Sequence, residues 1–176
     1  MIVIDTSVVI ERSASLCFSI IARGYFEHVR RWRYSLQELK QLTEGDVKLG
    51  TQSQETETVA GRKVDRTVEV SEFDPDKVFT LKRVGGDGTE THYVSSYRFN
   101  PVSRYRCEVT HHLELDRSGL SFKLLGMFVR RSLRNELDMA VGRRVKATVE
   151  ELTEPSGVMT ASQKAMIRPA TRGPSR

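Results

Sequence analysis

A histidine and a tyrosine on neighbouring stretches of the sequence are the side chains best suited to proton transfer. His111 is the best candidate for a general acid or base, since an unperturbed imidazole titrates near neutral pH. Tyr97 is the second candidate, because a phenol can donate a proton or a hydrogen bond. A histidine on an apolar strand face is, however, more often a hydrogen-bonded structural residue. No serine or carboxylate stands at a spacing that marks a catalytic triad, so an enzyme is not established.

Strict alternation places both candidates on apolar strand faces. Within 89–100 and 105–115 every second residue faces the same side, which predicts two half-buried strands. The residues predicted to face inward are Tyr93, Ser95, Tyr97 and Phe99 on the first strand, and Cys107, Val109, His111 and Leu113 on the second. A few polar groups within apolar walls are typical of a small-molecule site. The alternative is that the tyrosines are core residues whose hydroxyls find local partners.

Three charged residues on the preceding strands, Glu55, Glu57 and Arg66, are candidates for catalysis or ligand binding. Glu55 and Glu57 share one strand face roughly 6.6 Å apart, a separation found in paired catalytic carboxylates. A polar alternating strand usually has a solvated face, so we expect both on the surface. Arg66 shares its face with Val64 and Val68. It is either an inward charge that meets an acidic group of a ligand or a side chain extending to solvent at the rim of a sheet, and we expect the rim.

Metal and phosphate binding have little support. Cys107 and His111 share a face but lie roughly 13 Å apart along an extended strand, too far to bind one zinc ion. The glycine-rich run 85–88 precedes another strand instead of a helix, which predicts a hairpin turn and not a phosphate loop. We therefore expect neither a metal nor another cofactor.

The positive charge of the chain is concentrated at its C-terminal end. The net charge is +5, and residues 153–176 carry four basic residues against Glu154, a net +3, which leaves +2 for residues 1–152. No stripe of Lys and Arg interleaved with aromatic residues is present, so we do not expect nucleic acid as a partner. Arg30, Arg31 and Arg33 surround Trp32. This group is either solvated surface or a basic collar at a pocket mouth that attracts an anionic membrane surface.

The last of the predicted elements that position these residues is one long amphipathic helix over residues 120–152. Its predicted apolar stripe, at three-and-four spacing, contains Val129, Leu133, Leu137, Ala140, Val141, Val145, Thr148 and Leu152. Such a helix would be about 45 Å long and needs a wide surface to lie on. Its beginning, around Met127 and Phe128, is apolar on nearly all sides. It is either simply buried or a flexible lid that contacts a ligand or a dimer partner.

The alternating pattern in most of the chain before this helix predicts strands. A first strand over 2–11 is followed by two short helices, the first capped by Ser13, and then by strands over 48–59, 62–73, 77–84, 89–100 and 105–115, with a further strand within 34–42. Asn100-Pro101 should end the strand over 89–100. Short connections predict antiparallel pairing, and strands in one run with helices outside it predict an α+β fold. We expect a curved antiparallel sheet of six to seven strands around the C-terminal helix, in one domain over 1–152, followed by a mostly disordered basic tail over 153–176.

Several short fragments, in order, carry a resemblance to a known family. They are Val8-x-Ile10-x6-Cys17-Phe18, Glu27-His28-x3-Trp32, Leu49-Gly50-Thr51, Gly61-Arg62 and the segment Glu69–Pro75. With the terminal helix, they make the sequence resemble the START-like (SRPBCC) superfamily, in particular its polyketide cyclase/dehydrase and lipid-transport branch. The resemblance implies a helix-grip fold with a cavity for lipids, sterols, polyketides, quinones or other apolar molecules. Some members catalyse cyclisation or dehydration, but no universal catalytic motif exists, so no residue role carries over.

The leading hypothesis from the sequence is binding or transport of a small, largely hydrophobic ligand between sheet and terminal helix. The predicted ligand-binding residues are Trp32, Arg66, Phe79, Tyr93, Ser95, Tyr97, Val109, His111, Met127, Val129, Leu133 and Leu137. One alternative is a cyclase/dehydratase of the aromatase type that uses His111 and Tyr97, and another is a protein-interaction module. We expect a monomer or homodimer, with peripheral membrane contact left open.

The expected location is the cytoplasm. No apolar run approaches the ~20 residues that span a bilayer, and the first ten residues contain Asp5 and no basic start of a secretory signal. Two cysteines, Cys17 and Cys107, form no disulfide framework.

Overall fold

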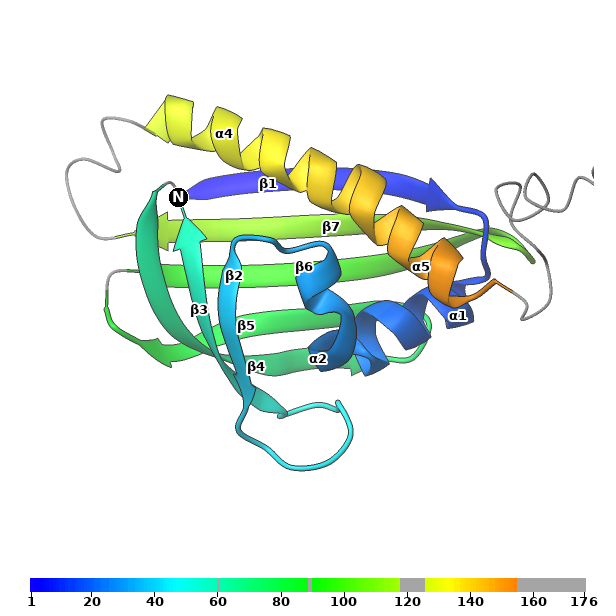
Figure 1. The fold of residues 1–176 in the computed structure, drawn as a ribbon, viewed down its shortest axis with the longest axis horizontal. Helices are drawn as coiled ribbons and strands as arrows, with labels where there is room; N and C mark the ends of the chain where they lie inside the picture. The colour runs from blue at the N-terminus through cyan, green and yellow to red at the C-terminus, as the bar shows by residue number, and fades with distance from the viewer. Residues whose placement is uncertain (60, 89, 118–125, 155–176) are drawn as a thin grey trace, which may run out of the picture.

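A curved antiparallel sheet with one long helix across its concave face forms the molecule (Figure 1). The computed structural model describes residues 1–59, 61–88, 90–117 and 126–154. Beyond Glu154 the predicted basic tail lies outside the described residues, as do residues 118–125 at the predicted start of the long helix. None of the helices in the described residues has the length and apolar composition of a membrane-spanning segment.

Seven strands make up the sheet in the part of the chain that the structure describes. They are β1 (Ile2–Ile10), β2 (Leu36–Gln41), β3 (Gln52–Val59), β4 (Arg62–Asp74), β5 (Val78–Gly86), β6 (Glu90–Ser103) and β7 (Arg106–Arg117). The spatial order is β1-β7-β6-β5-β4-β3-β2, so every strand after β1 pairs with its neighbour in sequence, and β1 closes onto β7. All pairs are antiparallel, as short connections require. The predicted α+β helix-grip fold is confirmed.

Several strand boundaries differ from the prediction. β3 begins at Gln52 instead of residue 48, and β5 continues through Gly85 and Gly86, which were predicted to lie in the turn. β6 does not end at Asn100 but continues through Pro101 to Ser103. Pro101 pairs with Cys107 next to a register shift at the turn end of the β6–β7 hairpin. A proline lacks the N–H of a ladder hydrogen bond, and a strand end with an irregular register tolerates that loss.

Two short helical segments follow β1 and cover one end of the concave face (Figure 1). They are α1 (Ala14–Phe18), which continues in the π-helical turn η1 (Ser19–Arg23), and α2 (Tyr25–His28), which continues in the 3-10 turn η2 (Val29–Arg31). The predicted cap is confirmed, since the Ser13 hydroxyl accepts a hydrogen bond from the Leu16 N–H at 3.3 Å. Phe18 packs edge-on against Phe73 and Phe99, with ring centroids 5.2 Å apart in each case. This end of the sheet is therefore filled by an aromatic core.

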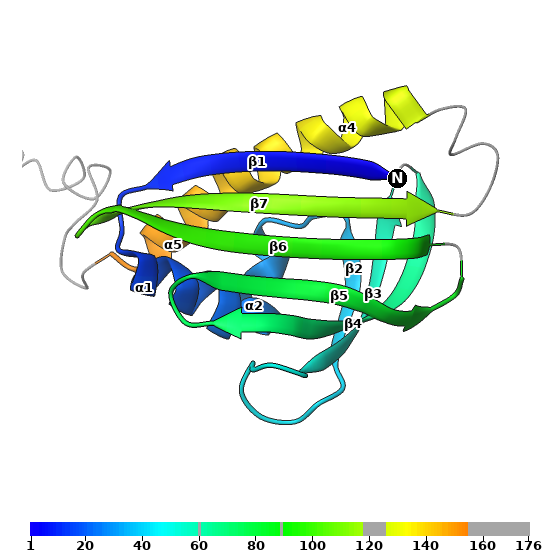
Figure 2. The same cartoon turned by 180° about the vertical axis from the view of Figure 1, so that it is seen from behind.

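The C-terminal helix crosses the rest of the concave face and leaves the opposite face of the sheet uncovered by helices (Figure 2). It consists of α4 (Gly126–Met139), a π-helical segment η3 (Ala140–Val145) and α5 (Lys146–Leu152). The predicted stripe is buried at Leu133, Ala140, Val141, Val145 and Thr148. A π segment interrupts the regular helix where it lies over the sheet, a feature that often marks a functional region.

Candidate ligand-binding pocket

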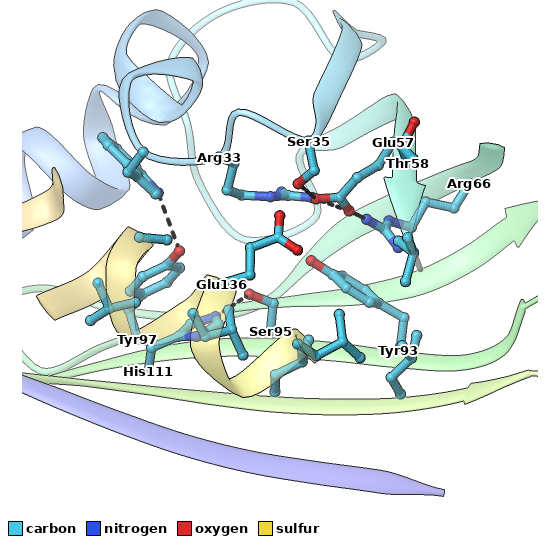
Figure 3. Close-up of a pocket in the computed structure, with 18 residues that line it drawn as sticks. Arg33, Ser35, Glu57, Thr58, Arg66, Tyr93, Ser95, Tyr97, His111 and Glu136 are labelled. Carbon is cyan, nitrogen blue, oxygen red and sulfur yellow. Dashed lines mark hydrogen bonds and ion pairs between the residues drawn. The ribbon is translucent and has the colours of Figure 1, made fainter. Parts of the chain in front are cut away.

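A pocket lies between the concave face of the sheet and the C-terminal helix (Figure 3). Its floor comes from β6 and β7, its roof from α4 and η3, and its side from the segment after η2, the end of β3 and Arg66 of β4. The floor residues are Tyr93, Ser95, Tyr97, His111, Leu113 and Leu115. The remaining lining residues are Trp32, Arg33, Ser35, Glu57, Thr58, Val59, Arg66, Leu133, Glu136, Leu137, Ala140 and Val141.

Most of the residues predicted to bind a ligand line this pocket. They are Trp32, Arg66, Tyr93, Ser95, Tyr97, His111, Leu133 and Leu137. Phe79 and Val109 point inward as predicted but are buried in the core and do not line it. The Phe79 ring lies behind Tyr97, at 6.4 Å between centroids, and Val109 pairs with Phe99 at the end that α1 covers. The side chains of Met127 and Val129 lie outside the described part of the structure.

The hairpin register brings the two proton-transfer candidates into contact. Tyr97 lies directly opposite His111, and their ring centroids are 4.5 Å apart. Ser95, two residues earlier on β6, shares a hydrogen bond with Nε2 of His111 at 2.9 Å. On the other side, Nε1 of Trp32 donates to the Tyr97 hydroxyl at 3.3 Å. These four side chains form one chain of contacts along the pocket wall.

Burial keeps this wall electrically neutral. It lowers the pKa of His111 to about 3, with a further contribution from the positive charge of Arg33, and it raises the pKa of Tyr97. At neutral pH His111 is therefore an uncharged imidazole and Tyr97 a phenol. Nδ1 of His111 is buried and has no hydrogen-bond partner among the described residues.

The Ser95–His111 contact has the length of a nucleophile–base pair, but His111 is poorly suited to activate the serine. An activated serine needs a base whose pKa lies near the working pH and a third group that orients the base. The low pKa of His111 and its unpartnered Nδ1 meet neither condition. The pair is better suited to hydrogen bonding than to nucleophilic catalysis.

A buried cluster of four charges closes one side of the pocket, formed by Arg33, Glu55, Glu57 and Arg66. Arg33 donates to Glu55 at 3.0 Å and 3.2 Å and to Glu57 at 2.8 Å. Arg66 donates to Glu55 at 3.2 Å and also binds Glu57. The hydroxyls of Tyr25 and Ser35 complete the carboxylate shells at 3.1 Å and 2.7 Å.

The predicted surface positions of three of these residues are wrong. Glu55, Glu57 and Arg66 are 0%, 8% and 1% exposed. The curled sheet and the segment after η2 enclose them, and that segment supplies Arg33 as a second counter-charge. Burial by itself would raise the pKa of both carboxyls, but Arg33 and then Arg66 outweigh it. They lower the pKa of Glu55 and bring the pKa of Glu57 to about 2.

This cluster leaves a tyrosine hydroxyl facing the pocket. The guanidinium of Arg66 lies 3.9 Å from the centroid of the Tyr93 ring. The Tyr93 hydroxyl has no hydrogen-bond partner among the described residues and points into the space between β6 and α4 (Figure 3). Burial raises the pKa of Tyr93, so the hydroxyl keeps its proton and can donate it to a ligand in a hydrogen bond.

Sequence reasoning missed the side of the pocket. Arg33 was considered as solvated surface or as part of a basic collar at a pocket mouth, not as a member of a buried ion cluster. Ser35, Thr58 and Val59 carry no local signal, because the curled end of the sheet and the segment before β2 bring them to the pocket. The floor residue Leu115 and the roof residues Ala140 and Val141 follow from the predicted faces. Glu136 had a usable signal, since it stands three residues after Leu133 and borders the apolar stripe.

A curved antiparallel sheet, a long terminal helix across it and a pocket between them define a START-like ligand-binding fold of the helix-grip type. The chain belongs to the family described as "Polyketide cyclase / dehydrase and lipid transport", whose model matches residues 1–153. The resemblance found in the sequence is thereby confirmed. No curated protein sequence matches the chain.

Three solved structures illustrate the similarity of the fold, and all three come from bacteria. One is a protein of Thermus thermophilus with 14% identity, covering 86% of this chain and 99% of that chain at a TM-score of 0.72. A second is a START superfamily protein from Mycobacterium smegmatis, with 15% identity, coverage of 87% and 100%, and a TM-score of 0.69. A third is an aromatase/cyclase from a Streptomyces species, with 17% identity, coverage of 88% and 97%, and a TM-score of 0.59. At these identities the similarity establishes the fold alone.

Proposed function

We propose that the protein binds a small, largely apolar molecule in the pocket between the β6–β7 face and the C-terminal helix. The observation that carries the proposal is the pairing of apolar walls with polar groups that have spare hydrogen-bonding capacity. Leu113, Leu115, Leu133, Leu137 and Val141 supply the apolar surface. Sites of this composition are typical for small molecules, because the apolar walls provide affinity and the few polar groups orient the ligand.

The size of the cavity favours a compact ligand. Its volume is about 60 Å³. A cavity needs roughly 10–15 Å³ to hold one water, so this space suits a compact ligand. A long-chain lipid would need the helix to move away from the sheet.

The free polar groups favour a ligand with hydrogen-bond acceptors. The Tyr93 hydroxyl is unpartnered among the described residues, and the Tyr97 hydroxyl accepts from Trp32 while its own proton has no acceptor there. Both tyrosines remain protonated because burial raises their pKa values. A carbonyl or hydroxyl oxygen on the ligand would satisfy them.

Filling the pocket tests this proposal. Ala140→Leu adds bulk to the roof, and we expect it to weaken binding at least 10-fold while changing stability by only about 1–3 kcal/mol. Ala147→Leu, on the exposed side of α5, is the matched control. Native mass spectrometry of gently purified protein should detect a bound small molecule in the wild type and in the control, but not in Ala140→Leu. Equal occupancy in all three proteins, or no adduct in any of them, would count against the pocket as a binding site.

A second candidate function is a cyclase or dehydratase of the aromatase type, favoured by the contact between Tyr97, His111 and Ser95. If these groups move protons, His111→Gln and Tyr97→Phe should each lower turnover of a polyketide substrate by about 10²-fold or more. Circular dichroism must show that both variants are folded. Turnover that survives both substitutions would exclude this assignment.

A further inference from the structure

The carboxylate of Glu136 is the one ionised group lining the described pocket that lacks a counter-charge among the described residues. The other charged lining residues, Arg33, Glu57 and Arg66, belong to the buried cluster with Glu55. Glu136 projects from α4 toward the pocket and forms no ion pair with a described residue (Figure 3). Its side chain is also exposed to solvent, so it stands at the pocket mouth.

Within the described lining residues and the buried cluster, the charges therefore sum to a negative value. Arg33 and Arg66 contribute two positive charges, and Glu55, Glu57 and Glu136 contribute three negative charges, which leaves −1. His111 adds nothing at neutral pH, because burial lowers its pKa to about 3. The pocket is thus more negative than the chain as a whole, whose net charge is +5.

An anionic ligand would find an unfavourable environment here. The terminal nitrogens of Arg33 donate to Tyr25, Glu55 and Glu57, so a ligand carboxylate would have to displace buried hydrogen bonds to reach them. Outside the cluster, the nearby Arg144 donates to the Trp32 carbonyl at 3.5 Å and stacks on Tyr34 at 3.8 Å. A carboxylate at the mouth would face Glu136 as well.

We infer that Glu136 selects ligands that carry a cationic group, such as an ammonium, at the end of a small apolar body. The inference rests on the proposed function of the pocket and adds the charge class of its ligand. The apolar body lies between Leu113 and Leu133, and the cation remains at the mouth beside the carboxylate. This location costs little desolvation, since Glu136 is already in contact with water.

Three size-matched probes test the inference: 3-phenylpropylamine, 3-phenylpropanol and 3-phenylpropanoate. Trp32 is the sole tryptophan of the chain and lines the pocket, so its fluorescence reports binding directly. An exposed ion pair contributes up to about 5-fold in affinity. With attraction for the amine and repulsion for the carboxylate, we expect the wild type at low salt to bind the amine about 10-fold more tightly than the carboxylate. The difference should shrink at high salt, where screening shortens the reach of surface charges.

The variant Glu136→Gln should lower affinity for the amine about 3- to 5-fold and leave affinity for the alcohol unchanged. Glu136→Lys should reverse the order of amine and carboxylate. Asp138→Asn, an exposed carboxylate on the same helix that does not line the pocket, is the control and should change none of the three affinities.

These measurements distinguish a failure of the charge inference from a failure of the proposed function. If the alcohol binds but the wild type shows no preference for the amine, or if Glu136→Gln changes all three affinities equally, the inference about charge is wrong and the proposed function stands. If none of the three probes changes Trp32 fluorescence, and Ala140→Leu behaves as the wild type, both the pocket and its charge selectivity are rejected.

Discussion

Replacing Arg66 by methionine should lower the free energy of unfolding by about 3–5 kcal/mol, among the largest effects of any single substitution in this chain. The methionine keeps much of the side-chain volume but leaves Glu55 and Glu57 buried with Arg33 as the remaining arginine of the cluster. A buried carboxylate without sufficient counter-charge carries a large desolvation penalty. The free energy of unfolding of native proteins is about 5–15 kcal/mol, so the variant should lose a large part of its stability. Urea denaturation measures this loss.

A matched control separates this effect from the general cost of losing an arginine. Arg62 lies on the same strand but is exposed, so Arg62→Met should change stability by less than about 0.5 kcal/mol. Adding Glu57→Gln to Arg66→Met removes one unpaired charge and should recover part of the loss, a coupling that a double-mutant cycle measures. A loss below about 1 kcal/mol for Arg66→Met would show that the cluster contributes little to stability.

The charge cluster also explains which part of the site could be predicted from the sequence. Alternation assigned Arg66 to the same face as its valine neighbours correctly, since strand side chains alternate with period two. Whether such a position lies at the rim or deep inside depends on what covers it. The cover is the segment around Arg33, far away in sequence, and no local pattern links it to Glu55. The strand face on which Arg66 lies was therefore predictable from the sequence, and its burial was not.

The floor of the pocket was predictable for the same reason. Once Tyr97 and His111 lie on adjacent strands joined by a short hairpin, the register brings them opposite each other. Ser95 then reaches His111 diagonally, two residues along the neighbouring strand. Phe79 shows the limit of the method, because the inward face of one curved sheet serves both the pocket and the aromatic core. The helical segments above the sheet divide these two regions, with α1 and α2 over the aromatic core and α4 over the pocket.

Acidification should destabilise the protein between about pH 6.5 and pH 5 through His111. Burial lowers the pKa of His111 to about 3 in the folded state, whereas the unfolded chain titrates near 6.5. In this range the unfolded chain binds a proton that the folded protein does not, so the free energy of unfolding falls as pH falls. At about 1.4 kcal/mol per pH unit, the loss amounts to about 2 kcal/mol by pH 5. His111→Gln keeps an amide near Ser95 but cannot titrate, so its stability should not show this loss.

His112, the next residue on β7, tests the direction of the pH effect, because its own effect on stability should be opposite to that of His111. Hydrogen bonds with Glu114 and Asp5 raise its pKa, so its stabilising contribution is present at low pH and is lost as pH rises through the folded-state pKa. Removing it by His112→Gln should therefore steepen the loss on acidification, whereas His111→Gln should flatten it. The interval above about pH 5 suits the comparison, because unfolded carboxyl groups titrate mainly below it. If urea denaturation of the wild type and of His111→Gln follows parallel curves from about pH 7.5 to 5, the imidazole is hydrated in the folded protein, and the pocket wall is wetter than its burial implies.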